Sequence, residues 1–257
     1  MARDFFGTAP VLFVKDIERS VRYYVDVLGF REPQLWGDPP GFAMPDRDGM
    51  IVMLSRQDNH DLIQPKKQIW DMYFWVRDAK ALLEEFSAKG AEVTQPLTYK
   101  EQYGNQEFII RDPDGYTLAF GQETGDCPFY VDRESASGPG HWMQLNPVLA
   151  SQDVRRDVSW YCDKLGFRML FNSGDTPLNY AGIANAGLEL HLQFQFPKDM
   201  TSTDLRIQVR QITDMFETCL QNGLVKPEAL RRNTPWGTHE FGFFDPSGNR
   251  IHFYQDV

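Results

Sequence analysis

The chain has 257 residues and a formal net charge of −10 at pH 7, with 42% hydrophobic and 14% aromatic residues. This composition indicates a folded globular protein, and the acidic balance argues against nucleic acid and anionic membranes as partners. No apolar run is long enough to span a membrane, the N-terminus lacks a signal-peptide pattern, and three widely spaced cysteines favour reduced thiols, so we expect a cytoplasmic protein.

The first half of the chain predicts two successive units of one strand, one helix and three strands. The first unit has a strand, a helix and three further strands over 9–14, 17–28, from Phe30, 42–44 and 50–56. Its helix has an N-cap candidate in Asp16 and ends at Gly29. The second unit has a strand, a helix, a strand and a hairpin over 70–76, 78–89, 91–94 and 107–120.

The same order of elements returns in the second half. Its predicted strands, helices and final hairpin cover 142–149, 153–165, 188–196, 205–209, 213–222 and 240–253. The two hairpins share an Asp-Pro-x-Gly turn, at Asp112–Gly115 and Asp245–Gly248. We therefore predict an α+β fold with a first domain over 1–121, a linker over 122–140 and a second domain over 141–257.

Three recurring motifs carry a family resemblance. Val14-Lys15-Asp16 precedes the first helix, Leu28-Gly29-Phe30 follows it, and the Asp-Pro-x-Gly turn closes each half. This layout resembles the vicinal oxygen chelate superfamily, which includes glyoxalase I, bleomycin-resistance proteins and extradiol dioxygenases. The resemblance implies four βαβββ units that form curved mixed sheets around clefts.

The C-terminal stretch is most similar to bleomycin-resistance proteins. The similarity rests on Pro235–Phe241, which contains Trp236, and on Asp245–Phe253. In that subfamily the fold binds a drug in a cleft and does no chemistry on it. The resemblance therefore implies binding of a small molecule.

Metalloenzymes of the superfamily place ligands at four recurring positions. In the first domain these positions fall near Ala9, Ile51, Asp71 and Ala119, of which only Asp71 can coordinate a metal. In the second domain they fall near Asn146, Glu189, Asp204 and His252, with His191 beside Glu189. Asn146 occupies a position where a His is usual, and His252 one where a Glu is usual. We expect no metal cofactor, and the alternative is a divalent metal ion held by Glu189, His191, Asp204 and His252.

Strand alternation predicts one apolar and one polar face for the second domain. The set predicted to pack under its helices is Leu188, Leu190, Leu192, Phe194, Leu205, Ile207 and Val209. The opposite, cleft-lining set is Glu189, His191, Gln193, Gln195, Asp204, Arg206, Gln208, Arg250, His252 and Tyr254. In the first domain, the helix-facing set is Met50, Val52, Leu54, Met72, Phe74 and Val76.

The residues predicted to contact a ligand combine aromatic and polar side chains. They are Tyr73, Trp75, Asp71, Asn146, Glu189, His191, Asp204, Arg206, Trp236, Arg250 and His252. Aromatic rings stack on planar or cationic groups, and the carboxylates pair with positive charge. The alternatives are that Tyr73 and Trp75 are core residues, and that His191 and His252 are ordinary hydrogen-bonded strand residues. Glu107 and Glu240 recur at one hairpin position, which also fits a structural hydrogen bond.

The predicted function is metal-free binding of a small, partly aromatic or cationic molecule by a monomer or homodimer. One alternative is a metal-dependent lyase or dioxygenase with its site in the second domain. Another is an enzyme that works without metal, with His191 or His252 as general base.

Overall fold

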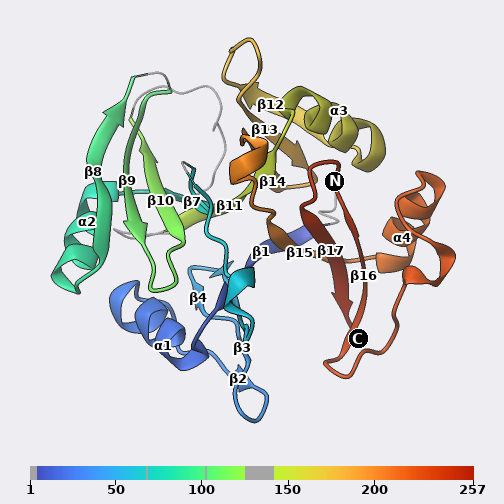
Figure 1. The fold of residues 1–257 in the computed structure, drawn as a ribbon, viewed down its shortest axis with the longest axis horizontal. Helices are drawn as coiled ribbons and strands as arrows, with labels where there is room; N and C mark the ends of the chain where they lie inside the picture. The colour runs from blue at the N-terminus through green and yellow to red at the C-terminus, as the bar shows by residue number, and fades with distance from the viewer. Residues whose placement is uncertain (1–4, 68, 102, 125–141) are drawn as a thin grey trace. The chain divides into compact units, whose positions relative to one another are not determined.

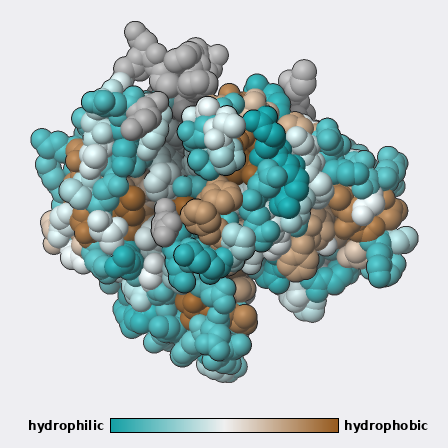
Figure 2. All heavy atoms as spheres, turned by 45° about the horizontal axis from the view of Figure 1, so that its top comes forward, coloured by the Kyte–Doolittle hydropathy of each residue, from teal (hydrophilic) through white to brown (hydrophobic). Residues whose placement is uncertain are grey.

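A computed structural model of the chain describes residues 5–67, 69–101, 103–124 and 142–257 (Figure 1). The chain divides into two compact units. The N-terminal unit is Val11–Asn146, and the C-terminal unit is Pro147–Val257 with the described residues up to Pro10. None of the helices in the described ranges is long and apolar enough to cross a membrane. The face drawn in Figure 2 is mostly hydrophilic, with hydrophobic residues in small patches.

The N-terminal unit consists of two modules, each with a mixed sheet and a helix. The first contains β1 (Phe5–Val14), α1 (Ile17–Arg22), a π-helical turn (Tyr23–Val27), β2 (Leu35–Trp36), β3 (Phe42–Ala43), β4 (Asp46–Arg47), β5 (Met50–Ile51), β6 (Met53–Arg56) and a 3-10 turn (His60–Leu62). The second contains β7 (Met72–Val76), α2 (Ala79–Ala88), β8 (Glu92–Lys100), β9 (Asn105–Arg111) and β10 (Thr117–Glu123). The strand orders are β1-β6-β3-β2 and β7-β10-β9-β8, and α2 packs on β8, β9 and β10 (Figure 1).

The C-terminal unit repeats this arrangement. Its first module contains β11 (Trp142–Ser151), α3 (Val154–Leu165), β12 (Arg168–Asn172), β13 (Tyr180–Asn185), β14 (Leu188–Phe194) and a 3-10 turn (Pro197–Asp199). Its second contains β15 (Asp204–Val209), α4 (Ile212–Gln221), a 3-10 turn (Pro227–Ala229), β16 (Thr238–Phe244) and β17 (Arg250–Asp256). The strand orders are β12-β13-β14-β11 and β16-β17-β15-β1, in which residues 5–10 of β1 pair antiparallel with β15. The α+β class and the four strand-helix-strand modules agree with the sequence analysis.

The element boundaries differ from the predicted ones at a few places. The helix predicted over 17–28 is α-helical only to Arg22 and continues as a π-helical turn. The strand predicted over 50–56 is interrupted at Val52, and the strand predicted over 91–94 extends to Lys100. Strand β10 runs to Glu123, while residues 125–141, which include most of the predicted linker and Cys127, lie outside the described residues.

The two Asp-Pro-x-Gly turns are held by a buried aspartate at their first position. In the first turn the Asp112 carboxylate accepts hydrogen bonds from the backbone N–H groups of Asp114 and Tyr116, each at 2.9 Å. In the second, Asp245 accepts from the backbone of Ser247 and Asn249 at 2.9 and 2.8 Å. These bonds fix the chain reversal from which the last two strands of each unit extend.

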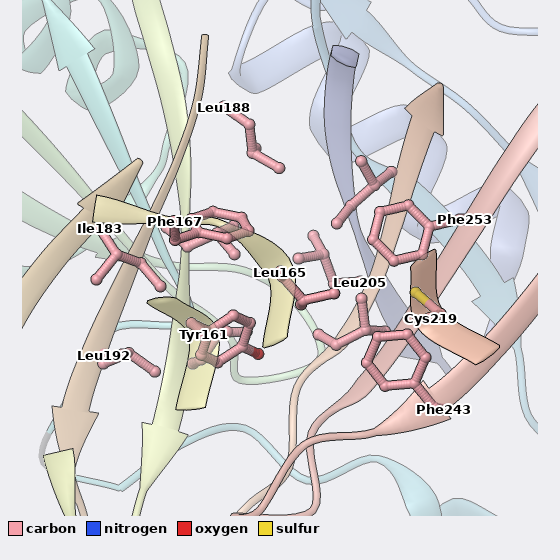
Figure 3. Close-up of a cluster of buried hydrophobic side chains, with 14 of the residues drawn as sticks. Tyr161, Leu165, Phe167, Ile183, Leu188, Leu192, Leu205, Cys219, Phe243 and Phe253 are labelled. Carbon is pink, nitrogen blue, oxygen red and sulfur yellow. The ribbon is translucent and has the colours of Figure 1, made fainter. Parts of the chain in front are cut away.

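The hydrophobic core of the C-terminal unit lies on the helix-facing side of its strands (Figure 3). The predicted set is confirmed there: Leu188, Leu190, Leu192, Leu205, Ile207 and Val209 belong to the buried cluster, and Phe194 packs against it. Side chains of α3 and α4 complete the cluster, among them Tyr161 and Cys219. The same strands are therefore left with one side free for polar groups.

The core of the N-terminal unit confirms its predicted set in the same way. Val52, Leu54, Met72, Phe74 and Val76 are buried in one cluster, against which Met50 packs. The rings of Phe74, Phe120 and Phe108 are stacked, with successive centroids 5.0 Å apart. Aromatic stacking thus joins β7, β10 and β9, which are neighbours in the sheet.

Candidate functional site

The side of β15, β17 and β16 opposite the core forms what we call the polar face. It comprises Asp204, Arg206, Gln208, Glu240, Gly242, Phe244, Arg250, His252 and Tyr254. Strand pairing places Arg206, His252 and Gly242 in one row across the sheet. The register therefore gathers the predicted residues Asp204, Arg206, Arg250 and His252 on three adjacent strands.

Glu240 is the most highly connected residue of this face. Its side chain is almost fully buried and pairs with Arg206 at 2.8 Å and with Arg231. It also accepts hydrogen bonds from the Trp236 indole and the Thr238 hydroxyl, each at 3.2 Å. Burial alone would raise the pKa of Glu240, but the bonds and charge of Arg206, with Trp236 and Arg231, hold that pKa below its usual value. These contacts support a structural role for Glu240, as a buried hydrogen-bond acceptor within the chain.

The remaining predicted charges of the polar face are also paired. Asp204 forms an ion pair with Arg250, and burial lowers the pKa of the Arg250 guanidinium. The Arg206 guanidinium lies over the Tyr254 ring, 4.9 Å from its centroid. Arg231 lies 5.7 Å from the centroid of the Trp236 ring, which is 58% exposed.

His252 differs from its neighbours on the polar face. Its Nδ1 atom is buried and has no hydrogen-bond partner among the described residues. Burial, and then the positive charges of Arg250 and Arg206, lower the pKa of His252 to about 4. The imidazole is therefore neutral at neutral pH, in a place where the local potential is positive.

A pocket of about 250 Å³ opens beside this histidine. It is lined by Ala229, Arg231, Phe241, Gly242, Phe243, Phe244, Arg250 and His252. The lining combines apolar carbon with three nitrogen-bearing side chains and contains no carboxylate. This mixture is typical of sites that hold small organic molecules.

Glu189 and His191 form a second group on β14. The His191 Nε2 atom lies 2.9 Å from Glu189 Oε1, and its Nδ1 atom lies 2.6 Å from the Tyr180 hydroxyl. The Phe171 ring meets the imidazole edge to face at 5.4 Å. Both imidazole nitrogens are thus engaged, which is the ordinary hydrogen-bonded role considered for His191.

A divalent metal ion, as implied by the fold, would need at least three converging donors. Within the described ranges, no three His, Cys, Asp or Glu side chains gather in that way. Asp204 is bound to Arg250, His191 is held by Tyr180, and His252 lies in a positive potential. The alternative ligand set predicted from sequence does not fit a metal in this arrangement.

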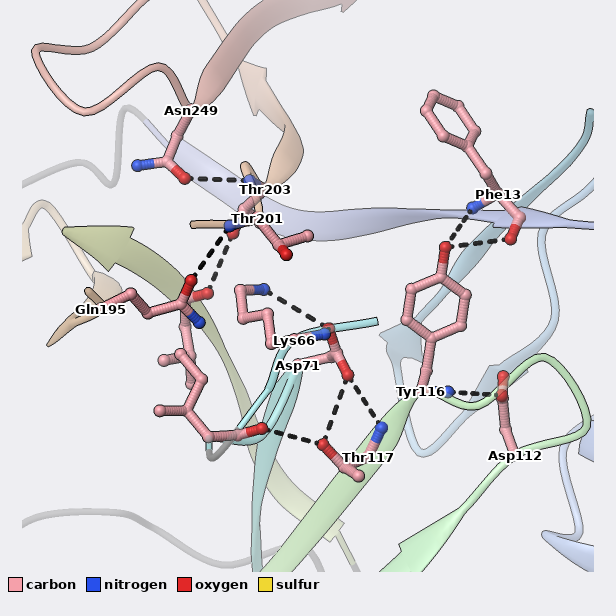
Figure 4. Close-up of polar contacts among 12 residues, drawn as sticks. Phe13, Lys66, Asp71, Asp112, Tyr116, Thr117, Gln195, Thr201, Thr203 and Asn249 are labelled. Carbon is pink, nitrogen blue, oxygen red and sulfur yellow. Dashed lines mark hydrogen bonds and ion pairs between the residues drawn. The ribbon is translucent and has the colours of Figure 1, made fainter. Parts of the chain in front are cut away.

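In the N-terminal unit, Asp71 is part of a buried ion pair (Figure 4). Its carboxylate lies 3.6 Å from the Lys66 ammonium group and accepts from the backbone N–H of Thr117 at 2.8 Å. Burial raises the pKa of Asp71 and lowers that of Lys66, and each is opposed by the charge of the other. Asp71 is therefore satisfied within the chain.

Tyr73 and Trp75 are 3% and 7% exposed, and their ring centroids lie 4.9 Å apart. The Tyr73 hydroxyl donates to Glu107 at 3.2 Å, and Glu107 also accepts from Tyr103 at 3.0 Å. This burial supports the core reading of both aromatic residues. Glu107 occupies the hairpin position of Glu240, so both copies use this glutamate as a buried acceptor.

Asn146 is fully buried, and its side-chain oxygen accepts from the Gln144 amide at 2.5 Å. The boundary between the two units falls inside β11, directly after Asn146, whereas Glu189, Asp204 and His252 belong to the C-terminal unit.

Sequence reasoning missed three residues that shape these clusters. Arg231 precedes β16 in a segment without periodicity, and Lys66 lies in a loop, so neither has a local signal. Tyr180 did have a local signal. It lies on β13 and pairs with Gln193 of β14, the strand that also carries His191. The pairing of β13 with β14 could therefore have predicted a contact between the Tyr180 hydroxyl and His191.

Comparison with known proteins gives matches in both halves of the chain. The sequence model described as "Glyoxalase/Bleomycin resistance protein/Dioxygenase superfamily" matches residues 8–120 and 140–253. A bleomycin resistance protein from Geobacillus stearothermophilus is 22% identical over 133 residues, which cover 45% of this chain and 98% of that protein.

Two solved structures resemble the fold over almost the whole chain. A glyoxalase I mutant from Zea mays gives a TM-score of 0.72 at 16% identity and covers 96% of this chain and 91% of its own. A putative dioxygenase from Bacillus subtilis gives 0.68 at 16% identity and covers 99% and 86%. At this identity the likeness concerns the fold alone.

Proposed function

The chain belongs to the glyoxalase/bleomycin resistance protein/dioxygenase superfamily, and within it we propose that this member binds a small, partly aromatic organic molecule without a metal ion. The observation that carries the proposal is the pocket beside His252, where Phe241, Phe243 and Phe244 meet Arg231 and Arg250. Aromatic walls with a few convergent polar groups are what an organic ligand requires. The sequence relationship to a bleomycin resistance protein supports a binding role.

The sequence analysis expected carboxylates to pair with a positively charged ligand. The contacts of these carboxylates give little support to a cationic ligand. Asp71, Asp204 and Glu240 each contact a lysine or arginine, and Glu189 contacts His191. A cationic ligand would have to displace these partners. Hydrogen bonds and aromatic contacts therefore give the better account of binding than charge pairing with a cation.

The alternative is a metal-dependent lyase or dioxygenase in the C-terminal unit. It would require Asp204 to leave Arg250 and His252 to bind a cation in a positive potential. Each change is unfavourable, because it separates an ion pair or brings like charges together.

Elemental analysis of protein purified without chelator, followed by a thermal-shift screen, tests the proposal. The screen contains divalent metals on one side and small aromatic acids, amides and amidines on the other. We expect substoichiometric metal and a melting temperature that rises with an organic ligand, because binding to the folded state stabilises it. Stoichiometric metal that is lost in His252→Ala and is needed for turnover would establish the alternative.

A further inference from the structure

The pocket beside β16 has an excess of positive charge, although the whole chain carries −10. Three guanidinium groups, those of Arg206, Arg231 and Arg250, are paired with only two carboxylates, Asp204 and Glu240. Three positive charges against two negative ones leave one positive charge. Asp256, at the far end of β17, is exposed and accepts from Gln208 instead.

The arginines of the pocket retain unused donors. Arg231 and Arg250 each contact their carboxylate through Nη2. A guanidinium has five N–H donors, two of them on that nitrogen, so three remain on Nε and Nη1 in each residue. No other carboxylate or carbonyl among the described residues accepts from these two side chains.

The edge of β16 adds backbone groups to the same place. The backbone N–H and C=O of Glu240 bond outward to Arg231, at 2.8 and 2.9 Å. Alternate residues of a strand direct these groups to the same side, so those of Gly242 and Phe244 also point away from β17. Both residues line the pocket, which therefore contains backbone donors next to the arginines.

The apolar residues of the lining limit which kind of molecule can bear the anionic group that the arginines bind. Phe241, Phe243, Phe244 and Ala229 are its apolar lining residues, and of the three phenylalanines Phe241 and Phe243 are core residues 2% and 7% exposed, whereas Phe244 is 67% exposed. A volume of about 250 Å³ has room for a single aromatic ring with a short substituent. An exposed phenyl group at the rim would be covered by such a ring.

We propose that this pocket binds the carboxylate of a small aromatic acid, with Arg231 and Arg250 as the anion-binding side chains and Phe244 against the ring. The planar, bidentate guanidinium matches a carboxylate in geometry as well as in charge. His252 adds an imidazole to the polar groups that line the pocket. The assignment deepens the proposed function, on which it rests, by naming the chemical class of the ligand.

Calorimetric titration of the full chain with benzoate, benzamide and benzamidine tests the assignment. The three probes share the ring and carry substituents of similar shape, of which benzoate is an anionic acceptor, benzamide a neutral donor and acceptor, and benzamidine a cationic donor. We expect benzoate to bind about 10- to 100-fold more tightly than benzamide, which is the ratio that a charge-assisted hydrogen bond provides, and benzamidine to bind most weakly. Added salt should weaken benzoate binding alone.

Two variants locate the site. Arg231→Gln should lower benzoate affinity about tenfold and leave benzamide unchanged, because the Arg231 side chain is 59% exposed and its loss spares the core. The double variant Asp204→Asn/Arg250→Gln removes a complete ion pair and should also lower benzoate affinity. Arg168→Gln, at an exposed arginine on β12, is the matched control and should bind benzoate normally.

Equal affinity for benzoate and benzamide, a preference for benzamidine, or absent benzoate binding by folded protein would each overturn the assignment. Benzamide or benzamidine binding without metal would then leave the proposed function standing. If no probe binds until a divalent metal is added, both inferences fail. These outcomes separate the class of ligand from the presence of a binding role.

Discussion

The imidazole of His252 lies against the α-carbon of Gly242 on the neighbouring strand. A Cβ atom at Gly242 would lie 3.1 Å from two ring carbons of His252 and 2.9 Å from the main-chain oxygen of Ile251. Real Cβ atoms are almost never that close to a backbone oxygen, so either the strand or the ring would have to move. The absence of a side chain at Gly242 therefore leaves the room that the His252 ring occupies.

Gly242→Ala should destabilise the protein by about 1–3 kcal/mol, the usual cost of adding a methyl group to a packed site. Urea denaturation measures this cost. Gly7→Ala, where a Cβ would meet nothing within 4 Å, is the control and should be nearly neutral. If His252→Ala fully rescued Gly242→Ala, the clash with the Ile251 oxygen would be shown not to matter.

The lowered pKa of His252 predicts a loss of stability in acid. The folded-state pKa of about 4 lies below the ordinary value of 6.5, so the unfolded chain binds the proton more readily. The contribution of His252 to stability is therefore complete above pH 6.5 and falls as the pH drops towards 4. His252→Gln should flatten the unfolding free energy over this window, as measured by denaturation at a series of pH values. An unchanged pH profile would show that burial does not lower the pKa of His252 in the folded protein.

Glu240 joins two arginines and an indole, so its charge should matter to the fold. Glu240→Gln leaves Arg206 and Arg231 without their carboxylate, and we expect a loss of about 1–3 kcal/mol in unfolding free energy. The fluorescence of Trp236 should change as well, because its indole N–H bonds to Glu240. Asp256→Asn, which alters an exposed acceptor, is the comparison and should cost little.

The buried pair of Lys66 and Asp71 predicts strong coupling between two substitutions. Lys66→Met leaves a buried carboxylate without its partner and should cost about 3–5 kcal/mol. Asp71→Asn in the same chain should recover much of that loss, since neither residue is then charged. The exposed Arg31, which pairs with Asp46 at the surface, gives the contrast, and Arg31→Gln should change stability very little. Additive effects at Lys66 and Asp71 would contradict the ion pair.

Local patterns predicted the faces of the strands and the repeated turns. Alternation assigned Leu205 and Ile207 to the core and Arg206 to the polar face, because a strand has a fixed period of two. The turn at Asp245 was predictable because its proline and glycine select that geometry.

What a polar residue contacts could not be predicted in the same way. The bonds of Glu240 to Arg231, and of Asp71 to Lys66, join a strand to a loop whose path has no sequence period. From the sequence alone, Asp71 was predicted to contact a ligand. In the structure its carboxylate pairs with Lys66 of the same chain. The pocket depends on the same loop-to-strand contacts, and for that reason Arg231 was missed.

Strands β15, β16 and β17 have their core side chains on one surface and mostly polar side chains on the other. Positions 204 and 250, which form an ion pair with each other, can consequently be varied together without touching the residues that hold α4 in place. Selection from such a paired library should yield variants with altered ligand preference, and these should melt closer to the parent than variants at Arg206, which holds buried Glu240. The duplicated architecture would then serve as a platform for engineered small-molecule receptors.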